Sequence, residues 1–346
     1  AAERGARGAT AIVRGREMAP NAASGDDDDD FTAFTIVVDA SACGGLDRDG
    51  LRCVAYPASE RVGSADGDVA ARAAAANRVA FDDIERERAI DAAWTARVRE
   101  NGLLFNATKF RFASARNAEE DIATTTPSNA RVVVELGITD YKTFLCTNLA
   151  ADWRAHVRDE GLGAPATVTV GAPPSSSSSR LMDLRYRHFA DALGNCVMLH
   201  TTDDKFMMLQ RSERVGEAPG AVVFPGGHAE PSAVNVADAV IDVSHLMFTA
   251  AMDELEEELG VGQEHINRVV CLGITRRVVN ARSCMIFYAE CRLTADEALA
   301  LYPSAEHGFE SHRAFSAILS DFENPEFMSR VPGDHCGAAE LLIKFL

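Results

Sequence analysis

The stretch DELEEELGV, residues 253–261, places five carboxylates within six positions at the end of a segment with helical periodicity. Apolar residues recur at helical spacing through that segment, at Leu246, Phe248, Ala251, Leu255 and Leu259. Gly260 stands where a helix C-terminus favours glycine. The pattern predicts a helix that ends at Gly260, and its acidic end is either a solvated face or a site for cations.

Spacing groups three of these carboxylates. Glu254 and Glu258 lie four positions apart and share one face of the helix if Leu255 points to the core. Glu257 lies one turn from Glu254. Carboxylates this close repel one another, whereas a divalent cation would bind to them. Ligands made only of oxygen favour Mg²⁺, with Mn²⁺ as a substitute.

Composition bounds the remaining possibilities. The 346 residues are 47% hydrophobic, which suits a sizeable core in two domains or in one domain with an extension. The formal net charge of −18 opposes binding to nucleic acid or to an anionic membrane. The eight cysteines form no C-x-x-C pair, and no apolar run approaches the ~18 residues that cross a bilayer. We expect a soluble protein with reduced thiols, a small-molecule substrate and neither a nucleic-acid nor a membrane partner, and the oligomeric state stays open.

Four segments follow from the distribution of charged and small residues. Residues 1–30 end in GDDDDD and are expected to form a disordered leader. Residues 31–160 are expected to form an N-terminal α+β domain and residues 181–346 a mixed α/β domain. Between them, residues 161–180 are rich in Gly, Pro and Ser and indicate a linker. The Ala- and Arg-rich start suits an organelle-targeting remnant as well as a cytoplasmic protein, so the compartment stays open.

Local patterns predict the elements of both domains. Residues 82–100 indicate an amphipathic helix that carries Ile84, Ile90, Trp94 and Val98 and ends at Asn101. Strands are expected within 31–40, 109–115, 131–138, 195–201, 205–212, 268–279 and 283–293, and further helices within 140–161, 294–302 and 337–346. The Ala-rich residues 68–80 are either a helix or an irregular insertion.

A glycine turn precedes the acidic helix. The sequence FPGGHAEP, residues 224–231, follows an expected strand, and its two glycines let the backbone approach a ligand or a metal closely. A PGG turn followed by a helix with E-L-x-E-E-x-G-V resembles the Nudix box, whose usual form is G-x5-E-x7-R-E-U-x-E-E-x-G-U, with U an aliphatic residue. In that family the box forms a loop, a helix and a loop that bind divalent metal for the hydrolysis of pyrophosphate bonds.

The match to the box is partial. The matching positions are Glu254, Leu255, Glu257, Glu258, Gly260 and Val261, but Asp253 replaces the Arg. No Glu stands at the sixth place after Gly227, and 27 positions lead from Gly227 to Glu254, which is 12 more than in the usual box. These departures indicate either a degenerate box or a divergent branch of the family.

Other segments favour the divergent branch. Residues 89–115, 136–148, 216–231 and 245–261 resemble the UDP-glucose and UDP-galactose diphosphatases of the nucleoside diphosphate-linked moiety X motif 22 type and their plant relatives. Those proteins share the lengthened box and the missing Arg. The resemblance covers the chain from about Phe34 to the C-terminus, apart from the serine-rich insertion. It implies a Nudix α/β/α sandwich preceded by a smaller α+β domain, and Mg²⁺-dependent cleavage of UDP-sugars to UMP and sugar 1-phosphate.

The resemblance also implies roles for the box residues. Glu254 and Glu258 would be the metal carboxylates. Glu257 would be a further ligand or would position a water molecule, and the Gly227 carbonyl would be an additional ligand. Which carboxylate takes the proton of the attacking water is open.

Candidates for substrate contacts lie in both domains. Arg211 and Arg214, ahead of the box, either clamp phosphate oxygens or form an ordinary surface pair. Tyr141, Thr147 and Asn148 either line a uracil or ribose pocket between the domains or cap and pack helices.

Three other side chains have two interpretations each. Lys109 and Arg111 share one side of an expected strand, which faces either phosphate or solvent. His228, beside the glycines, is either a ligand or a turn histidine that bonds to the backbone.

Two other functions stay open. The substrate could be another nucleoside diphosphate derivative, such as ADP-ribose or coenzyme A. The missing Arg and Glu of the box also allow a catalytically silent module that binds nucleotides or has a regulatory role.

Overall fold

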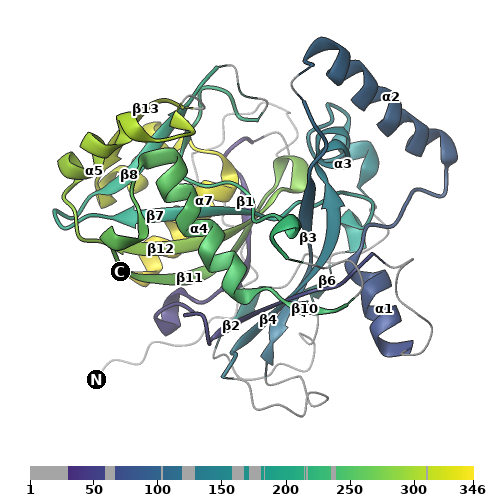
Figure 1. Ribbon diagram of the computed structural model, residues 1–346, viewed down its shortest axis with the longest axis horizontal. Helices are drawn as coiled ribbons and strands as arrows, with labels where there is room; N and C mark the ends of the chain where they lie inside the picture. The colour runs from purple at the N-terminus through teal and green to yellow at the C-terminus, as the bar shows by residue number, and fades with distance from the viewer. Residues whose placement is uncertain are drawn as a thin grey trace, which may run out of the picture.

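The computed structural model describes residues 30–58, 67–102, 104–118, 129–157, 167–170, 181–182, 184–213, 215, 217–234, 239–308 and 311–346. Two β-sheets and the helices that cover them form a mixed α/β protein (Figure 1). The expected leader up to residue 29, the serine run 175–179 and Arg214 lie outside the described residues. None of the described helices is long and apolar enough to cross a membrane.

Most strands of the larger sheet come from the second half of the chain. Its strands are β1 (Phe34–Asp39), β5 (Val168–Thr169), β7 (Gly194–His200), β8 (Phe206–Arg211), β9 (Val222–Val223), β11 (Ile266–Arg277), β12 (Ser283–Cys291) and β13 (Ser311–Ala317). They lie in the order β13-β8-β7-β12-β11-β1-β5, with β9 paired to β8. The central strands are mixed in direction, because β12 runs antiparallel to β11 and parallel to β7.

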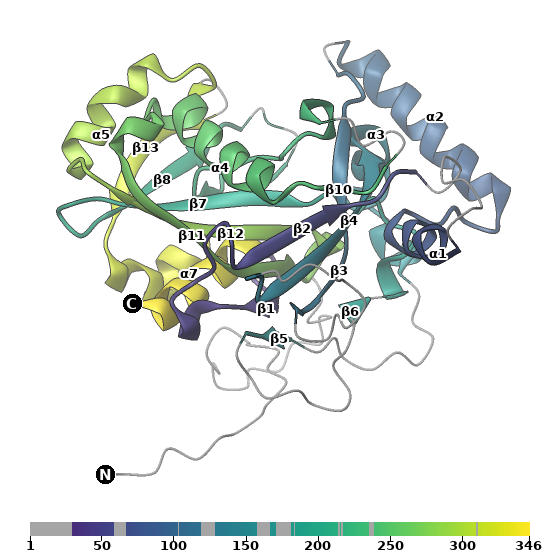
Figure 2. The ribbon, with the colours of Figure 1, turned by 60° about the horizontal axis from the view of Figure 1, so that its bottom comes forward.

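Helices cover both faces of this sheet (Figure 2). α4 (Ser244–Leu259) packs on the face that carries Val197 and Leu199 of β7. α7 (Gly333–Phe345) packs on the face that carries Cys196 and Met198. Because successive side chains of a strand point to opposite faces, a nearly continuous apolar strand such as β7 serves both layers. The larger sheet and these helices make the expected α/β/α arrangement.

The acidic helix forms where the spacing predicts it. α4 ends at Leu259, and Gly260 caps it in the left-handed conformation with φ +74°, donating its N–H to the Glu256 carbonyl. The buried side chains are Met247, Phe248, Ala251, Met252, Leu255, Glu258 and Leu259. Leu246, expected in the stripe, is only partly buried, and Met247 and Met252 extend the stripe instead. One carboxylate, that of Glu258, therefore lies on the buried side of the helix.

A smaller sheet lies beside the larger one. Its strands are β2 (Leu51–Ala55), β3 (Thr108–Asn117), β4 (Val132–Asp140), β6 (Leu181–Met182) and β10 (Ile241–Asp242), in the order β10-β2-β4-β3-β6. β3 and β4 pair antiparallel, which confirms the strand pair predicted from residues 109–115 and 131–138. Phe110 and Leu136 of this sheet belong to the same buried cluster as Phe248 and Leu255 of α4, so the two sheets share one core.

The remaining helices are α1 (Gly67–Ala76), α2 (Ile84–Glu100), α3 (Tyr141–Cys146), α5 (Ala295–Leu301) and α6 (Pro325–Met328). α1 settles the Ala-rich segment as a helix. α2 starts where Asp83 accepts a hydrogen bond from the Glu85 amide, and it ends at Asn101 as expected. Its predicted apolar stripe is correct at Ile90, which is buried, and wrong at Ile84, which is 60% exposed.

Each sheet contains a strand that comes from the other part of the sequence. β1 comes from the first part of the sequence but pairs with β11 of the larger sheet. β10 comes from the second part but pairs with β2 of the smaller sheet. β5 lies within the expected linker and pairs with β1. The division of the chain at residues 161–180 stays a prediction.

Candidate active site

A glycine loop follows β9 and runs along the end of β7. The Pro225 carbonyl accepts a hydrogen bond from the Val197 amide at 2.8 Å, and the Gly227 carbonyl accepts one from the Asn195 amide at 2.9 Å. A Cβ atom on Gly226 would collide with the Asn195 carbonyl, and one on Gly227 would collide with the Glu254 carboxylate. Close approach of backbone therefore requires glycine at 226, whereas a side chain at 227 would displace the Glu254 carboxylate.

Two carboxylates of α4 turn to this loop. The Glu258 carboxylate accepts a hydrogen bond from the Gly226 amide at 2.8 Å. The Glu254 carboxylate accepts one from the His228 amide at 3.1 Å. Because the two glutamates are four residues apart, one turn of α4 carries both side chains to three consecutive loop residues. Their role as metal ligands stays a prediction.

The third box carboxylate points elsewhere. Glu257 pairs with His307, with 3.1 Å between the carboxylate and the Nδ1 atom. The His307 amide also donates to the Glu257 carbonyl at 2.7 Å. Across the described part of the chain, no three His, Cys, Asp or Glu side chains converge closely enough to hold a metal ion. The structure therefore joins Glu254 and Glu258 at one loop but leaves Glu257 outside.

The donors at the loop fit an oxygen-preferring cation. Mg²⁺ is commonly held by one or two protein carboxylates, with water and substrate phosphate completing its shell. Glu254 and Glu258 supply two carboxylates to one place, and Glu258 is only 6% exposed. The Gly227 carbonyl already accepts one hydrogen bond and keeps a second lone pair.

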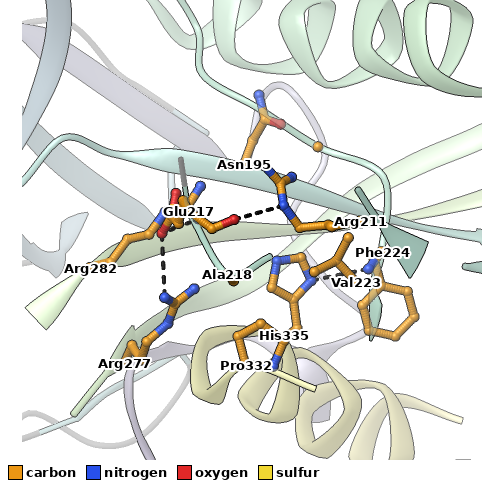
Figure 3. Close-up of a pocket in the computed structure, with 11 residues that line it drawn as sticks. Asn195, Arg211, Glu217, Ala218, Val223, Phe224, Arg277, Arg282, Pro332 and His335 are labelled. Carbon is orange, nitrogen blue, oxygen red and sulfur yellow. Dashed lines mark hydrogen bonds and ion pairs between the residues drawn. The ribbon is translucent and has the colours of Figure 1, made fainter. Parts of the chain in front are cut away.

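A pocket lies on the other side of the same loop, at the start of α7. Its lining includes Arg211, Glu217, Arg277, Arg282, Pro332 and His335, together with Asn195 and Gly226. We call it the arginine pocket. Its cavity volume is only about 20 Å³. Figure 3 shows Arg211, Arg277 and Arg282 around Glu217, with His335 and Pro332 at the end of α7 beside Arg277.

Glu217 and Asp334 hold these arginines. The Glu217 carboxylate lies 2.8 Å from Nη1 of Arg282 and 3.3 Å from Nη1 of Arg277. The Glu217 carbonyl accepts a hydrogen bond from Nε of Arg211 at 3.0 Å. Asp334, in the first turn of α7, accepts from both Nε and Nη2 of Arg277, at 3.0 and 2.8 Å.

Charge and burial set the protonation of the pocket. Burial disfavours the charged form of Arg282, but the carboxylates of Glu217 and Asp334 outweigh it and raise the pKa of Arg282. Burial also acts against the charged form of Asp334, but Arg277 and its neighbours outweigh it and hold the pKa of Asp334 well below its usual range. Burial lowers the pKa of His335 to about 4. At neutral pH Arg282 and Asp334 are therefore charged, and the ring of His335 is neutral.

The sequence alone does not identify most of the residues that line this pocket. Only Arg211 had been named as a candidate for phosphate, and its partner Arg214 lies outside the described residues. Arg277 and Arg282 lie within RRVVNARS, residues 276–283, which connects two expected strands. The three arginines in this short stretch are the sequence signal that points to them.

Asn148 has a buried position between the two sheets. Its amide nitrogen donates to the Asn280 carbonyl at 2.8 Å, and its amide oxygen accepts from the Asp191 amide at 3.0 Å. The side chain is 0% exposed. Asn280, Ala281 and Asp191 have φ values of 64°, 55° and 44°, a conformation that side chains other than glycine rarely adopt. Asn148 thus fixes a strained turn, the one that leads into Arg282.

The other candidates from the first half of the chain also have partners. The Thr147 hydroxyl donates to the Thr143 carbonyl at 2.7 Å. The Tyr141 amide donates to the Ala107 carbonyl at 2.9 Å, and its ring packs at the edge of a buried cluster. Lys109 pairs with Glu230 at 2.6 Å. Arg111 is buried and donates to backbone carbonyls, including that of Tyr186 at 3.1 Å, so neither a phosphate wall nor a solvent face describes it.

His228 donates its amide to Glu254, while its ring lies edge-on to Phe144, with 5.9 Å between ring centroids. Within the described residues, Nε2 of this buried ring has no hydrogen-bond partner. Burial lowers the pKa of His228 well below its ordinary value, so the ring is neutral at pH 7. The structure therefore confirms neither of the two interpretations of its side chain.

Comparison with known proteins places this chain. It is similar to Nudix hydrolase 9 of Arabidopsis thaliana, with 34% identity over 277 residues, 77% of this chain and 82% of that protein. The chain belongs to the Nudix hydrolase family. It is also similar to the uridine diphosphate glucose pyrophosphatase NUDT22 of Bos taurus, with 32% identity over 241 residues, 67% of this chain and 74% of that protein.

The other two comparisons add little. No protein-family model matches the chain. A solved Nudix hydrolase from Nitrosomonas europaea covers 44% of this chain and 86% of its own, with 16% identity and a TM-score of 0.31, which is too low to decide the fold.

The Nudix assignment gives the lengthened box a structural explanation. The segment between the glycine loop and α4 contains β10, which pairs with β2 of the smaller sheet. The Val243 amide, just before α4, donates to the Cys53 carbonyl at 2.8 Å. The additional residues of this Nudix box therefore connect the start of its helix to the smaller sheet.

Proposed function

We propose that this Nudix protein hydrolyses the diphosphate bond of UDP-glucose and UDP-galactose, giving UMP and sugar 1-phosphate. The observation that carries the proposal is the attachment of Glu254 and Glu258 to amides of the Gly226–His228 loop. The relationship to uridine diphosphate glucose pyrophosphatases supports the choice of substrate.

The loop carboxylates are proposed to hold Mg²⁺, or Mn²⁺ as a substitute, together with the Gly227 carbonyl. When bound, such a cation neutralises the charge of the diphosphate and activates a water molecule for attack on phosphorus. The amides of Gly226 and His228 hold the two carboxylates at the loop. Glu257 is proposed as a further ligand or a water-positioning group, a role that requires it to leave His307.

Substrate contacts are proposed on both sides of the loop. Arg211 lines the arginine pocket and can reach a phosphate oxygen there. Arg214 is proposed as its partner. Tyr141 is a proposed contact to the uridine. Asn148 was expected there too, but its amide group already bonds to the backbone of Asn280 and Asp191, so we propose that it supports the turn into Arg282 instead.

A panel of nucleotides tests the substrate. The protein is incubated with UDP-glucose, UDP-galactose, ADP-ribose and coenzyme A in the presence of Mg²⁺, and a phosphatase converts the phosphomonoester products to measurable phosphate. We expect the two UDP-sugars to be hydrolysed and ADP-ribose to be a poor substrate. Turnover of ADP-ribose at an equal or greater rate would contradict the proposal and favour a different Nudix substrate.

Chelation tests the metal. EDTA should abolish turnover, and Mg²⁺ or Mn²⁺ added back should restore it, because the proposed ligands are all oxygen atoms. Activity that persists after exhaustive chelation would refute the metal mechanism. Binding of UDP-glucose without any turnover would instead support the silent nucleotide-binding module, which Asp253 in place of the box Arg also allows.

A further inference from the structure

The arginine pocket has more positive than negative charge. Arg211, Arg277 and Arg282 face two carboxylates, those of Glu217 and Asp334. Arg277 is 3% exposed and Arg282 is 9% exposed, so water screens their charges little. Glu217 and Asp334 match the charges of these two arginines, so the surplus positive charge is that of Arg211, which is only partly buried and can attract an anion.

The guanidinium of Arg282 has unused hydrogen-bonding capacity. Its Nε atom is buried and has no hydrogen-bond partner among the described residues. Its Nη1 atom pairs with Glu217 at 2.8 Å. Gly194 faces this guanidinium, and a Cβ atom there would lie 2.8 Å from Nη2 of Arg282. An arginine fork that is only partly paired suits an incoming oxyanion, which accepts two hydrogen bonds side by side.

The two carboxylates that pair with these arginines differ in how they are held. Asp334 is 0% exposed, belongs to α7 and binds Arg277 with two hydrogen bonds, so it is a fixed part of the scaffold. The Glu217 side chain is 15% exposed and lies on the connection between β8 and β9. Among the residues that the structure describes, only Glu217 pairs with both Arg277 and Arg282 while lining the pocket.

The pocket also adjoins the proposed metal site. Gly226 lines the pocket and donates its amide to Glu258, so one residue of backbone separates the two. The first turn of α7 lies on another side, with Pro332 and His335 in the lining. The positive end of this 13-residue helix adds to the attraction for an anion.

We propose that the arginine pocket is a phosphate subsite, in which one phosphoryl group of a diphosphate replaces the Glu217 carboxylate as the partner of Arg277 and Arg282. Glu217 acts as an exchangeable counter-ion that keeps the arginines in position while the subsite is empty. This inference rests on the proposed function for the identity of the diphosphate. Its chemistry, an oxyanion on a partly paired arginine fork, does not require catalysis.

Inorganic pyrophosphate tests the subsite without turnover. Isothermal titration calorimetry in EDTA compares the wild-type protein with Glu217→Gln and with Glu213→Gln. Glu213 is exposed, belongs to the same connection and does not line the pocket, so it controls for the loss of one charge. Removing the competing carboxylate should tighten pyrophosphate binding about tenfold in Glu217→Gln. In Glu213→Gln the dissociation constant should stay within about twofold.

Arg282→Lys should have the opposite effect on the affinity for pyrophosphate. Lysine keeps the charge but lacks the planar fork, so pyrophosphate binding should weaken about tenfold. Circular dichroism and thermal unfolding show whether each variant is folded. The proposal is overturned if folded Glu217→Gln binds pyrophosphate no more tightly than the wild type, or if neither protein binds it at millimolar concentration.

A competition arm separates this inference from the proposed function. UDP-glucose should displace bound pyrophosphate if the subsite takes a phosphoryl group of the substrate. Displacement without hydrolysis of any UDP-sugar would refute the proposed function and leave the subsite standing. Pyrophosphate binding that UDP-glucose does not displace would show a site for free anions only and would overturn the assignment to the substrate.

Discussion

The Glu258 carboxylate accepts a hydrogen bond from the Gly226 amide at 2.8 Å, which joins α4 to the glycine loop that precedes it. Glu258 is 6% exposed and lies on the apolar side of the helix. Burying a carboxylate is costly even when it accepts one hydrogen bond. On a solvated acidic face Glu258 would be exposed to water. Its burial against the loop therefore favours a cation site over an exposed charged face.

Gly227→Ala should disturb the site directly. A Cβ atom at this position would collide with the Glu254 carboxylate, so the carboxylate or the loop must move. We expect turnover to fall at least about tenfold and stability to fall by about 1–3 kcal/mol. Gly102→Ala is the control, because a Cβ atom there meets nothing within 4 Å. Wild-type turnover in Gly227→Ala would show that the loop does not need to approach Glu254.

Asn148→Ala separates a structural role from a substrate contact. The change leaves the Asn280 carbonyl and the Asp191 amide without their partner, and a buried unpaired group costs about 1–3 kcal/mol. We expect chemical denaturation to show a loss of this size, while the KM for UDP-glucose, measured well below the melting temperature, stays unchanged. A raised KM with unchanged stability would restore Asn148 as a substrate contact.

The buried ring of His335 makes stability depend on pH. Its pKa is lowered to about 4, while an exposed histidine has a pKa of about 6.5. Between these two values the unfolded chain binds a proton that the native protein excludes, so the free energy of unfolding falls as the pH is lowered through this window. The contribution of this one group is roughly 3 kcal/mol between pH 7 and pH 4.

His335→Asn isolates that contribution. The Nδ1 atom of His335 accepts a hydrogen bond from the Phe224 amide at 3.1 Å, and an asparagine oxygen can take its place. Urea unfolding of both proteins from pH 7 to pH 4 should show a smaller loss of stability in the variant. An equal loss in both would mean that His335 does not titrate in this window.

Local spacing explains which parts of the site could be predicted from the sequence. The helix, its cap at Gly260 and the shared direction of Glu254 and Glu258 depend on residues within a few turns of one another. The opposite direction of Glu257 could not be predicted, because its partner His307 is 50 residues away and follows α5.

Contacts between distant segments account for the rest. The arginine pocket combines Arg211, Glu217, Arg277 and Arg282, which come from separate elements and meet only in the folded protein. Asp334 of α7 pairs with Arg277 beside the pocket. β10 has two residues and no hydrophobic period of its own, so it exists because β2 offers a free edge. Sequence periodicity carries no information about either arrangement.

Glu258→Gln tests the central claim most directly. Glutamine keeps the size of the side chain and an oxygen for the Gly226 amide, but it removes the charge that a cation would bind. Glu256→Gln is the matched control, because Glu256 is exposed and two residues away on the other side of α4. The measurement is the kcat for UDP-glucose at saturating Mg²⁺, with circular dichroism to show that both variants are folded. We predict a fall of about 100-fold or more in Glu258→Gln and less than about twofold in Glu256→Gln, since each ~1.4 kcal/mol of lost transition-state stabilisation is a factor of ten. Equal losses in the two folded variants, or no loss in either, would contradict the assignment of Glu258 to the metal site.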